Sequence, residues 1–332
     1  QEITEKLEKG LEELFDSDKY KEYLSTMAKF HNYSFNNTLL IAMQKPDASL
    51  VASYGSWQKN FHRYVKKGEK GIRIIAPAPY KTKREREVID PSTRQPVKDN
   101  SGHVKKEEVE VTVNSFKPVC VFDVSQTEGE PIPQMGAGEL LQSVEGYQDF
   151  VEAMKEIAPV PISFEEIDGN AKGYFSPVGQ KIVIQSGMSE SQTLKTLVHE
   201  ISHSLLHDKD NVRIEGIDEA KKNRSTKEVE AESVAYTVCQ HFGIDSSDYS
   251  FGYVAGWSSG KEMKELKNSM ETIRKTASKV INDVEGKIQE LQKERAKENE
   301  LPFVMDDKII EILSKDEKKN MVYEKSGMMR NL

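Results

Sequence analysis

The chain has 332 residues, of which 36% are hydrophobic and 31% charged, and its formal net charge at pH 7 is −8. This length favours two domains, and the composition fits a packed core under a very polar surface. No apolar run approaches the length of a membrane span and no signal peptide is recognisable, so we expect a cytoplasmic protein without a membrane partner. Cys120 and Cys239 lie in apolar surroundings, which favours buried, reduced thiols.

The first third of the chain changes from helical to strand patterns. Residues 1–45 repeat apolar side chains at helical spacing. Strand patterns follow at 72–80, 109–113 and 119–122. Residues 81–107 are polar and carry turn signals, which predicts a protruding hairpin or mobile loop. Residues 127–138 are rich in Pro and Gly and fit a linker.

Between Ser56 and Asp90 the local charge is positive although the whole chain is acidic. This segment holds ten Lys and Arg residues against four Asp and Glu residues, with aromatic side chains interleaved. Cations follow phosphates and flat rings stack on unpaired bases, so the pattern suits single-stranded nucleic acid. A solvated basic face with Trp57, Phe61 and Tyr64 in a core fits equally well. The candidate binding residues are Trp57, Lys59, Arg63, Tyr64, Lys66, Lys67, Lys70 and Arg73.

A metal-binding motif, HExxH, occupies residues 199–203. Ser189 and Gln192 fit a capping box, and an apolar stripe at helical spacing predicts a helix around the motif. Residues four apart share a helix face, so His199 and His203 can bind one zinc ion, Zn²⁺. Glu200 lies beside them, where it can act as a general base.

A second helix, predicted over residues 225–242, offers a third ligand. Glu228 and Glu232 are four apart and share a face. We assign Glu228 as the metal ligand and Glu232 as the acceptor of a hydrogen bond from a ligand histidine. Ser225 and Glu228 also fit a capping box, in which Glu228 would only cap the helix. Glu230 is expected on the solvated surface.

Three further features lie near this predicted site. His207 continues the spacing of the motif, but it is two turns from His199 and is therefore expected to support a ligand or the structure. Tyr236 is a candidate hydrogen-bond donor to a transition state, and a core position fits it as well. The residues from Gly173 to Ile184 predict a short hairpin, whose strand could hold an extended peptide by strand addition.

The remaining patterns complete the predicted architecture. Helix resumes over residues 139–160, and a long amphipathic helix follows Trp257, where packing onto the core is favoured over a coiled coil. Residues 297–332 form a charged tail. We predict an α+β protein: an α/β domain over 1–126, a linker over 127–138, and a mostly helical zincin-like domain with a small β-sheet over 139–296.

These residues support a family resemblance. Four segments resemble the N-terminal domain of ArdC-type antirestriction proteins, which is associated with single-stranded DNA binding: 36–40, 56–58, 65–71 and 121–124. The C-terminal half is similar to the metallopeptidase half of the same family and to ImmA/IrrE-type peptidases, where HExxH is followed by Glu-x-x-Ala. Here Glu228 and Ala231 fit that pattern, and the segment 252–257 is also similar. The resemblance covers most of residues 30–295 and adds Asn36 and Asn37 to the candidate DNA-binding residues.

The resemblance implies a bacterial protein of mobile genetic elements that protects incoming single-stranded DNA and carries a zinc peptidase module. Its partners would be single-stranded DNA and a protein or peptide substrate. The alternative is a non-enzymatic, DNA-binding antirestriction protein whose metal site is structural or vestigial. A metal-dependent nuclease fits less well, because such sites gather carboxylates around magnesium.

Overall fold

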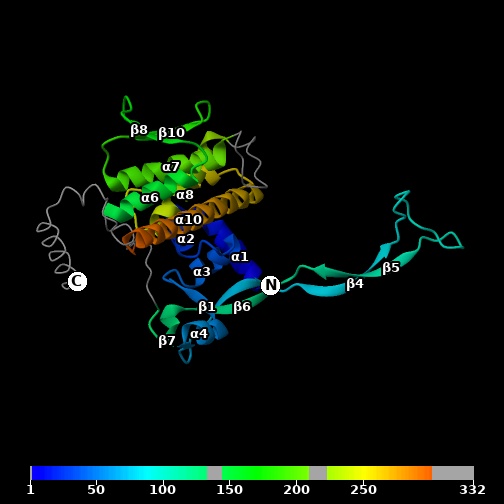
Figure 1. Ribbon diagram of the computed structural model, residues 1–332. Helices are drawn as coiled ribbons and strands as arrows, with labels where there is room; N and C mark the ends of the chain where they lie inside the picture. The colour runs from blue at the N-terminus through cyan, green and yellow to red at the C-terminus, as the bar shows by residue number, and fades with distance from the viewer. Residues whose placement is uncertain (1, 133–143, 209–222, 301–332) are drawn as a thin grey trace, which may run out of the picture. The chain divides into compact units, whose positions relative to one another are not determined.

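The computed structural model describes residues 2–132, 144–208 and 223–300 (Figure 1). The chain divides into two compact units, Gln1–Glu285 and Gly286–Leu332. Helix α10 (Met263–Glu300) begins in the first unit and ends in the second. The predicted tail lies outside the described residues, apart from its first four residues at the end of this helix.

The predicted helices of the first 45 residues are confirmed. They are α1 (Glu2–Glu13), α2 (Ser17–Lys29) and α3 (Phe35–Gln44). Asp16 and Ser34 cap α2 and α3 through side-chain oxygens that accept backbone N–H groups of the first turn. The apolar faces of α2 and α3 are buried, including Leu24, Met27 and Leu40.

A small antiparallel sheet follows, in the order β1-β6-β3. Its strands are β1 (Val51–Ser53), β3 (Ile72–Pro77) and β6 (Phe116–Asp123). Helix α3 lies against β3, and Phe30, Ile41, Ile72, Ile74 and Val121 belong to the core cluster between helices and sheet. Cys239 is buried as predicted, but Cys120 is exposed, because it faces away from this core on β6.

The predicted linker is partly wrong. Thr127–Gly129 forms strand β7, which pairs antiparallel with β2 (Arg63–Val65). Between β1 and β2 lies α4 (Tyr54–Phe61), and a short 3-10 helix, η1 (Val124–Gln126), precedes β7. Residues 133–138 of the proposed linker lie outside the described residues.

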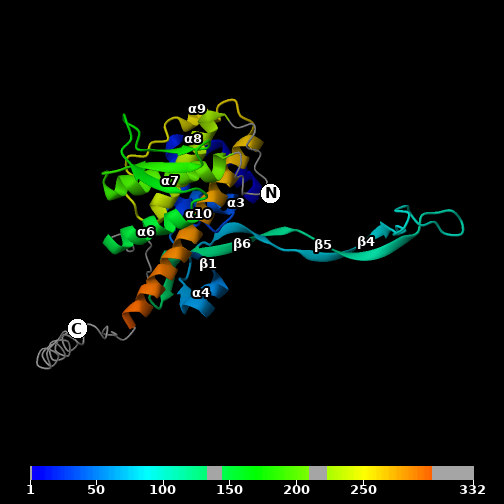
Figure 2. The same ribbon diagram turned by 45° about the horizontal axis from the view of Figure 1, so that its top comes forward.

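The polar insert forms a two-stranded ribbon, as one of the two sequence interpretations predicted. Strands β4 (Tyr80–Glu87) and β5 (Lys106–Val113) pair along their full length and lie side by side in Figures 1 and 2. Their register continues that of β3 and β6 without a shift: Pro77 faces Phe116, and Tyr80 faces Val113. The insert is therefore an extension of the sheet's central hairpin.

The C-terminal half is mostly helical with a small mixed sheet, which confirms the predicted α+β class. It contains α6 (Val144–Ile157), β8 (Ile162–Glu165), β9 (Gly173–Ser176), β10 (Lys181–Gln185), α7 (Glu190–His207), α8 (Arg224–His241) and α9 (Val254–Ser258). The strand order is β8-β10-β9, with β9 and β10 forming the predicted hairpin. Helix α7 lies against both of these strands and against α8.

Helices from the two ends of the first unit pack against each other. Tyr20 of α2 shares a 2.8 Å hydrogen bond with the hydroxyl of Ser233 on α8. On α10, the Arg274 guanidinium donates to the carbonyl of Tyr33. Ser269 of α10 also donates to Glu230 of α8 at 2.8 Å, which confirms for this part of the helix the prediction that it packs onto the peptidase-like core. Within the described residues, no helix is both long and apolar enough to cross a membrane.

Candidate metal centre and nucleic-acid surface

The HExxH motif lies on a regular, buried helix. Ser189 caps α7 by accepting the N–H of Gln192 at 3.3 Å, while the Gln192 side chain contacts Thr196 and Lys172, so the capping box is only half formed. Leu197, Val198 and Ile201 are fully buried along the apolar stripe. This packing fixes the rotation of α7 and turns His199 and His203 to one side of the core.

The two motif histidines and Glu228 converge on one point. The Nε2 atoms of His199 and His203 are 3.1 Å apart. An Oε2 atom of Glu228 lies 3.4 Å from His203 Nε2 and 3.9 Å from His199 Nε2. Tetrahedral zinc with ligands at about 2.0–2.1 Å places ligand atoms about 3.3 Å from one another. The three side chains therefore fit the spacing required to hold a divalent metal.

The start of α8 excludes the capping role considered for Glu228. The helix is capped by Asn223, whose side chain accepts the N–H of Thr226 at 2.8 Å. Glu228 is therefore beyond the first turn, and its carboxylate is half exposed beside the two histidines. The proximity of His203 is the main cause that lowers the pKa of Glu228, so the carboxylate carries its charge where a cation would bind.

Burial keeps the candidate ligand His199 neutral. The pKa of His199 is lowered to about 4, mainly by burial and also by the neighbouring His203, with Glu228 acting in the opposite direction. A neutral imidazole has a lone pair available for a metal at neutral pH. The buried environment of His199 therefore keeps it in the neutral form that a metal ligand requires.

Glu200 lines the same cleft as His199. This cleft has a volume of about 420 Å³, and Thr196, Glu232 and Gly173 also contribute to its walls. Burial raises the pKa of Glu200, and the backbone N–H of Phe175 on β9 counteracts this by hydrogen bonding to the carboxylate. Gly173 allows β9 to approach α7, because a Cβ there would lie 2.7 Å from Thr196 Cγ2.

A hydrogen-bonded chain supports His203 from behind. His203 Nδ1 is 3.0 Å from His207 Nδ1, and His207 Nε2 is 3.3 Å from Glu230 Oε2. Ser269 of α10 donates to the other oxygen of Glu230 at 2.8 Å. If His203 binds metal through Nε2, its Nδ1–H donates to His207, and the Nε2–H of His207 donates to Glu230. His207 therefore lies where the sequence suggested, behind a ligand.

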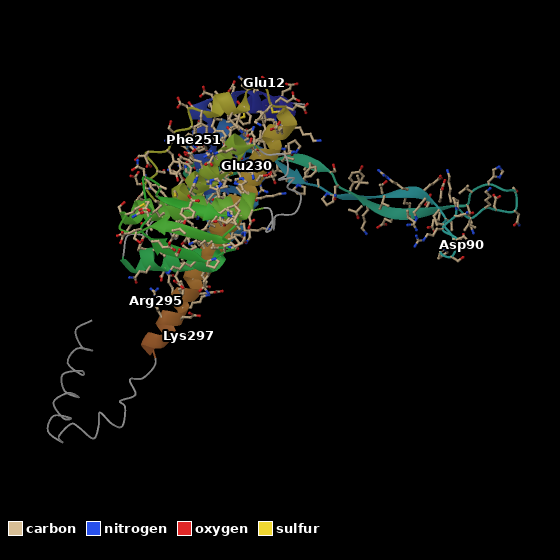
Figure 3. The ribbon with its side chains drawn as sticks, turned by 90° about the horizontal axis from the view of Figure 1, so that it is seen from above. Glu12, Asp90, Glu230, Phe251, Arg295 and Lys297 are labelled. Atoms are coloured by element: carbon tan, nitrogen blue, oxygen red, sulfur yellow. The ribbon has the colours of Figure 1, made fainter. Side chains whose placement is uncertain are left out.

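Glu230 was expected on the surface, and this prediction is wrong. Its side chain is fully buried, and Figure 3 places it among the helices. A charged carboxylate can remain buried there because His207 and Ser269 supply hydrogen bonds. Sequence reasoning missed this residue, since the only available signal was its position two residues after Glu228.

We predict that Glu230→Gln weakens metal binding about 10- to 100-fold, the usual effect of removing an anionic partner of a ligand histidine. A neutral amide polarises His207, and through it His203, less than a carboxylate does. Zinc affinity, measured by competition with a chromophoric chelator, tests this. Glu262→Gln, at an exposed position before α10, is the control. Unchanged zinc affinity in Glu230→Gln would show that the hydrogen bonds from His203 through His207 to Glu230 do not affect metal binding.

The partner predicted for Glu232 is not the one found, and Tyr236 takes the second of the two roles considered for it. Glu232 accepts a hydrogen bond from the hydroxyl of Tyr253, and no ligand histidine contacts it among the described residues. Tyr236 is buried, its hydroxyl shares a 2.8 Å hydrogen bond with Ser25, and its ring packs on Phe251. The core interpretation of Tyr236 is therefore correct. Tyr253, 40% exposed, is the tyrosine beside Glu232, and its only sequence signal was its place in segment 252–257.

Several candidate DNA-binding residues are structural. Trp57 is fully buried and its indole N–H donates to the carbonyl of Phe122 at 2.8 Å. The Asn37 side-chain amide donates to the carbonyl of Ile75 and accepts the N–H of Ile75, both at 2.8 Å. The Arg63 guanidinium donates to Thr127 Oγ1 and to carbonyls of β7. These hydrogen bonds tie the three side chains to neighbouring strands and give them a structural role in the domain.

Most of the remaining candidates are exposed. Tyr64 is 54% exposed, and Asn36, Lys59, Lys67 and Lys70 are also exposed. Lys66 is exposed but donates to the carbonyl of Ser125, and Arg73 pairs with Glu2 at 2.6 Å. In the later part of the basic segment, four charged side chains form cross-strand ion pairs in the ribbon. These pairs are Lys81–Glu110, Lys83–Glu108, Arg86–Glu107 and Lys106–Glu85.

Comparison with known proteins supports the N-terminal assignment. Residues 1–122 match the family described as the N-terminal domain of anti-restriction factor ArdC. The ArdC-type resemblance predicted for this part of the chain is therefore confirmed.

Over 308 residues the chain is 30% identical to pXO2-81, an uncharacterized protein of Bacillus anthracis, with 84% of this chain and 50% of the relative covered. The chain thus spans about half the length of this curated relative. Two crystal structures of the antirestriction ArdC protein from plasmid R388 are also similar. The metal-free one has 20% identity and a TM-score of 0.46, covering 77% of this chain and 85% of that chain. The Mn(II)-bound one has 18% identity and a TM-score of 0.44, covering 76% and 84%.

Proposed function

We propose that this protein is a zinc metallopeptidase that binds single-stranded DNA, cleaves a protein or peptide, and serves antirestriction during conjugative transfer in the bacterial cytoplasm. The observation that carries the proposal is the convergence of His199, His203 and Glu228 on one point, next to a cleft that His199 and Glu200 line together. Two histidines and one carboxylate leave the fourth zinc position open, as in catalytic rather than closed structural zinc sites, and Glu200 is a separate acidic side chain beside them.

The residues of the cleft divide the chemistry among them. When bound, zinc supplies a Lewis acid and lowers the pKa of a water molecule to about 7. Glu200, whose pKa is raised by burial, is placed to accept a proton from the attacking water and to deliver it to the leaving amine. Tyr253, whose hydroxyl donates to Glu232 of the cleft wall, is our candidate for stabilising developing charge.

An extended peptide has a place to bind beside these groups. In the order β8-β10-β9, one edge of β9 has no strand partner within the described residues. This edge faces α7, as the hydrogen bond from the Phe175 N–H to Glu200 indicates. Addition of a substrate strand at such an edge would carry a peptide bond past the metal ligands.

The DNA-binding part of the proposal rests on the ArdC N-terminal domain and its exposed basic surface. Positive side chains with Tyr64 among them suit a flexible, unpaired strand better than a duplex.

The proposal is tested by incubating zinc-loaded protein with a proteome-derived peptide library, with and without a single-stranded oligonucleotide, followed by mass spectrometry. New cleavage sites that a chelator abolishes support the peptidase. Strand binding without any cleavage would leave only the non-enzymatic alternative.

A further inference from the structure

A second cleft, distant in sequence from the metal ligands, is lined by cations. It has a volume of about 430 Å³ and lies between α1, the end of α3 and the loop that leads from β2 into β3. Lys6, Lys45, Lys70 and Arg73 line it, and Asp47 is the only carboxylate that the described residues contribute to its walls. This volume is within the usual range of small-ligand sites, about 300–1,000 Å³.

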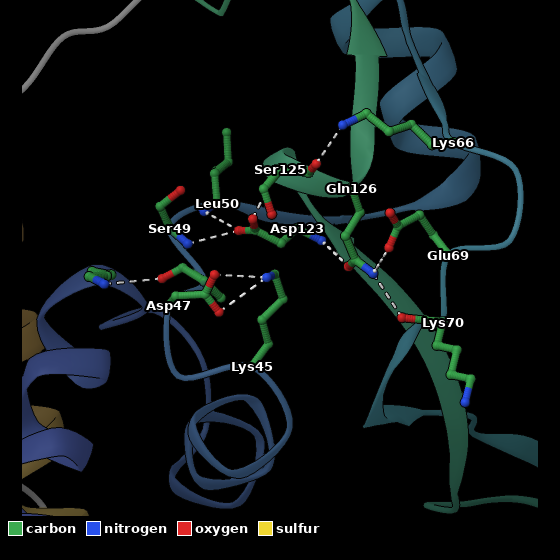
Figure 4. A network of polar contacts seen from close by, with 12 residues as sticks. Lys45, Asp47, Ser49, Leu50, Lys66, Glu69, Lys70, Asp123, Ser125 and Gln126 are labelled. Carbon is green, nitrogen blue, oxygen red and sulfur yellow. Dashed lines mark hydrogen bonds and ion pairs between the residues drawn. The ribbon is translucent and has the colours of Figure 1, made fainter.

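Half-buried or buried polar side chains fix the backbone on three sides of this cleft. Gln44 accepts the N–H of Arg73 at 3.0 Å and donates to its carbonyl at 2.9 Å. Gln126 donates to the carbonyl of Lys70 at 2.9 Å. Asp123 accepts the N–H groups of the segment that follows Asp47, at Ser49 and Leu50 (Figure 4). The cationic side chains therefore project from backbone that is already ordered.

The charges of the cleft are not balanced. Glu2 pairs with both Lys6 and Arg73, at 3.3 and 2.6 Å, and Asp47 pairs with Lys45 at 3.0 Å. The ammonium of Lys70 has no ion pair or hydrogen bond with the described residues, and Figure 4 shows it without a contact. The four lining cations and the two carboxylates paired with them leave a charge of +2, and the Glu69 carboxylate next to them accepts a hydrogen bond from Gln126. Glu2 and Asp47 are 62% and 75% exposed, and such surface pairs are weak enough for a bound anion to replace them.

We infer that this cleft binds phosphate groups, and that in the proposed DNA-binding function it seats the backbone of one or two nucleotides of the strand. Three ammonium groups act as point charges for a phosphate, and the Arg73 guanidinium can bind two phosphate oxygens at once. That single-stranded DNA supplies the phosphate rests on the proposed DNA-binding function. That the cleft can bind phosphate rests only on the cations that line it. It adds Lys6 and Lys45 to the binding residues.

The test measures binding of a fluorescein-labelled oligothymidylate by anisotropy over a series of NaCl concentrations. Removal of one lysine–phosphate interaction should reduce the slope of log K against log salt by about 0.7, equivalent to about fivefold in affinity near 0.1 M salt. We expect this for each of Lys6→Gln, Lys45→Gln and Lys70→Gln, and a reduction of about 2 in the slope for the triple variant. Lys70→Arg should keep the wild-type slope, since it keeps the charge.

Lys98→Gln, in the exposed end of the ribbon, removes the same charge away from the cleft and should change nothing. Calorimetric titration with thymidine monophosphate and with inorganic phosphate separates a strand site from a free-phosphate site. If the wild type binds the strand and the triple variant binds it with the same slope, the inference is wrong while the DNA-binding function stands. If the wild type binds no strand, that function fails. Phosphate binding by the cleft is then supported only if the wild type binds thymidine monophosphate or phosphate and the triple substitution abolishes that binding.

Discussion

Glu200→Gln should lower peptidase kcat/KM by about 10²- to 10⁴-fold, the usual contribution of a general base, while zinc binding is retained. Gln has the same shape and can still accept the N–H of Phe175, but it cannot take a proton. Glu200 is only 8% exposed and its pKa is raised by burial, so the substitution removes a buried base with a raised pKa. Rates measured on a peptide from the library, together with the zinc content of both proteins, give the comparison.

Glu190→Gln is the matched control, since Glu190 lies exposed in the first turn of the same helix. It should leave the rate unchanged. Equal rates for wild type and Glu200→Gln would remove the catalytic role and favour a structural metal site. Incubation with labelled single strands covers the third possibility, because strand cleavage would indicate a nuclease instead.

Trp57→Ala should reduce the free energy of unfolding by about 3–5 kcal/mol, as expected for truncating a buried tryptophan. Trp57 is fully buried, its ring lies 4.9 Å from that of Phe61, and the carbonyl of Phe122 would lose its indole donor. Tyr64→Ala, by contrast, removes an exposed ring and should leave stability nearly unchanged. It should weaken binding of a single strand by about 1–3 kcal/mol.

Urea denaturation and anisotropy, applied to both variants, separate a core role from a stacking role. Trp57→Phe keeps an aromatic ring in the core and provides a folded variant for the binding assay, in which it should match the wild type. A Trp57→Phe protein of normal stability that fails to bind the strand would contradict the assignment of Trp57 to the core.

The three residues of the candidate metal centre could largely be predicted, because their arrangement follows from spacing along two helices. Residues 199 and 203 share a helix face through helical periodicity alone, and a single carboxylate on the next helix completed the set. The roles of Trp57, Arg63 and Asn37 were not predictable from composition. Their partners Phe122, Thr127 and Ile75 lie 65, 64 and 38 residues away in the sequence. A basic or aromatic side chain looks the same in a sequence whether it faces solvent or clamps a distant strand.

Helix α8 illustrates a second limit. It packs against both α2 and α7, and Ser269 of α10 also reaches it, so buried side chains occur around most of its circumference. Without a single apolar stripe, periodicity could not show which of Glu228, Glu230 and Glu232 faces the histidines. Glu230 was misassigned for this reason, and the partner of Glu232 proved to be Tyr253, twenty-one residues further along.

The zinc content of the purified protein tests the central claim most directly. Mass spectrometric metal analysis of the wild type, His203→Ala and Glu228→Ala, after dialysis against limiting zinc, should give about one zinc ion per chain in the wild type. His203→Ala should give almost none, and Glu228→Ala should bind more weakly. A wild type without zinc, or a His203→Ala variant that keeps it, would contradict the account.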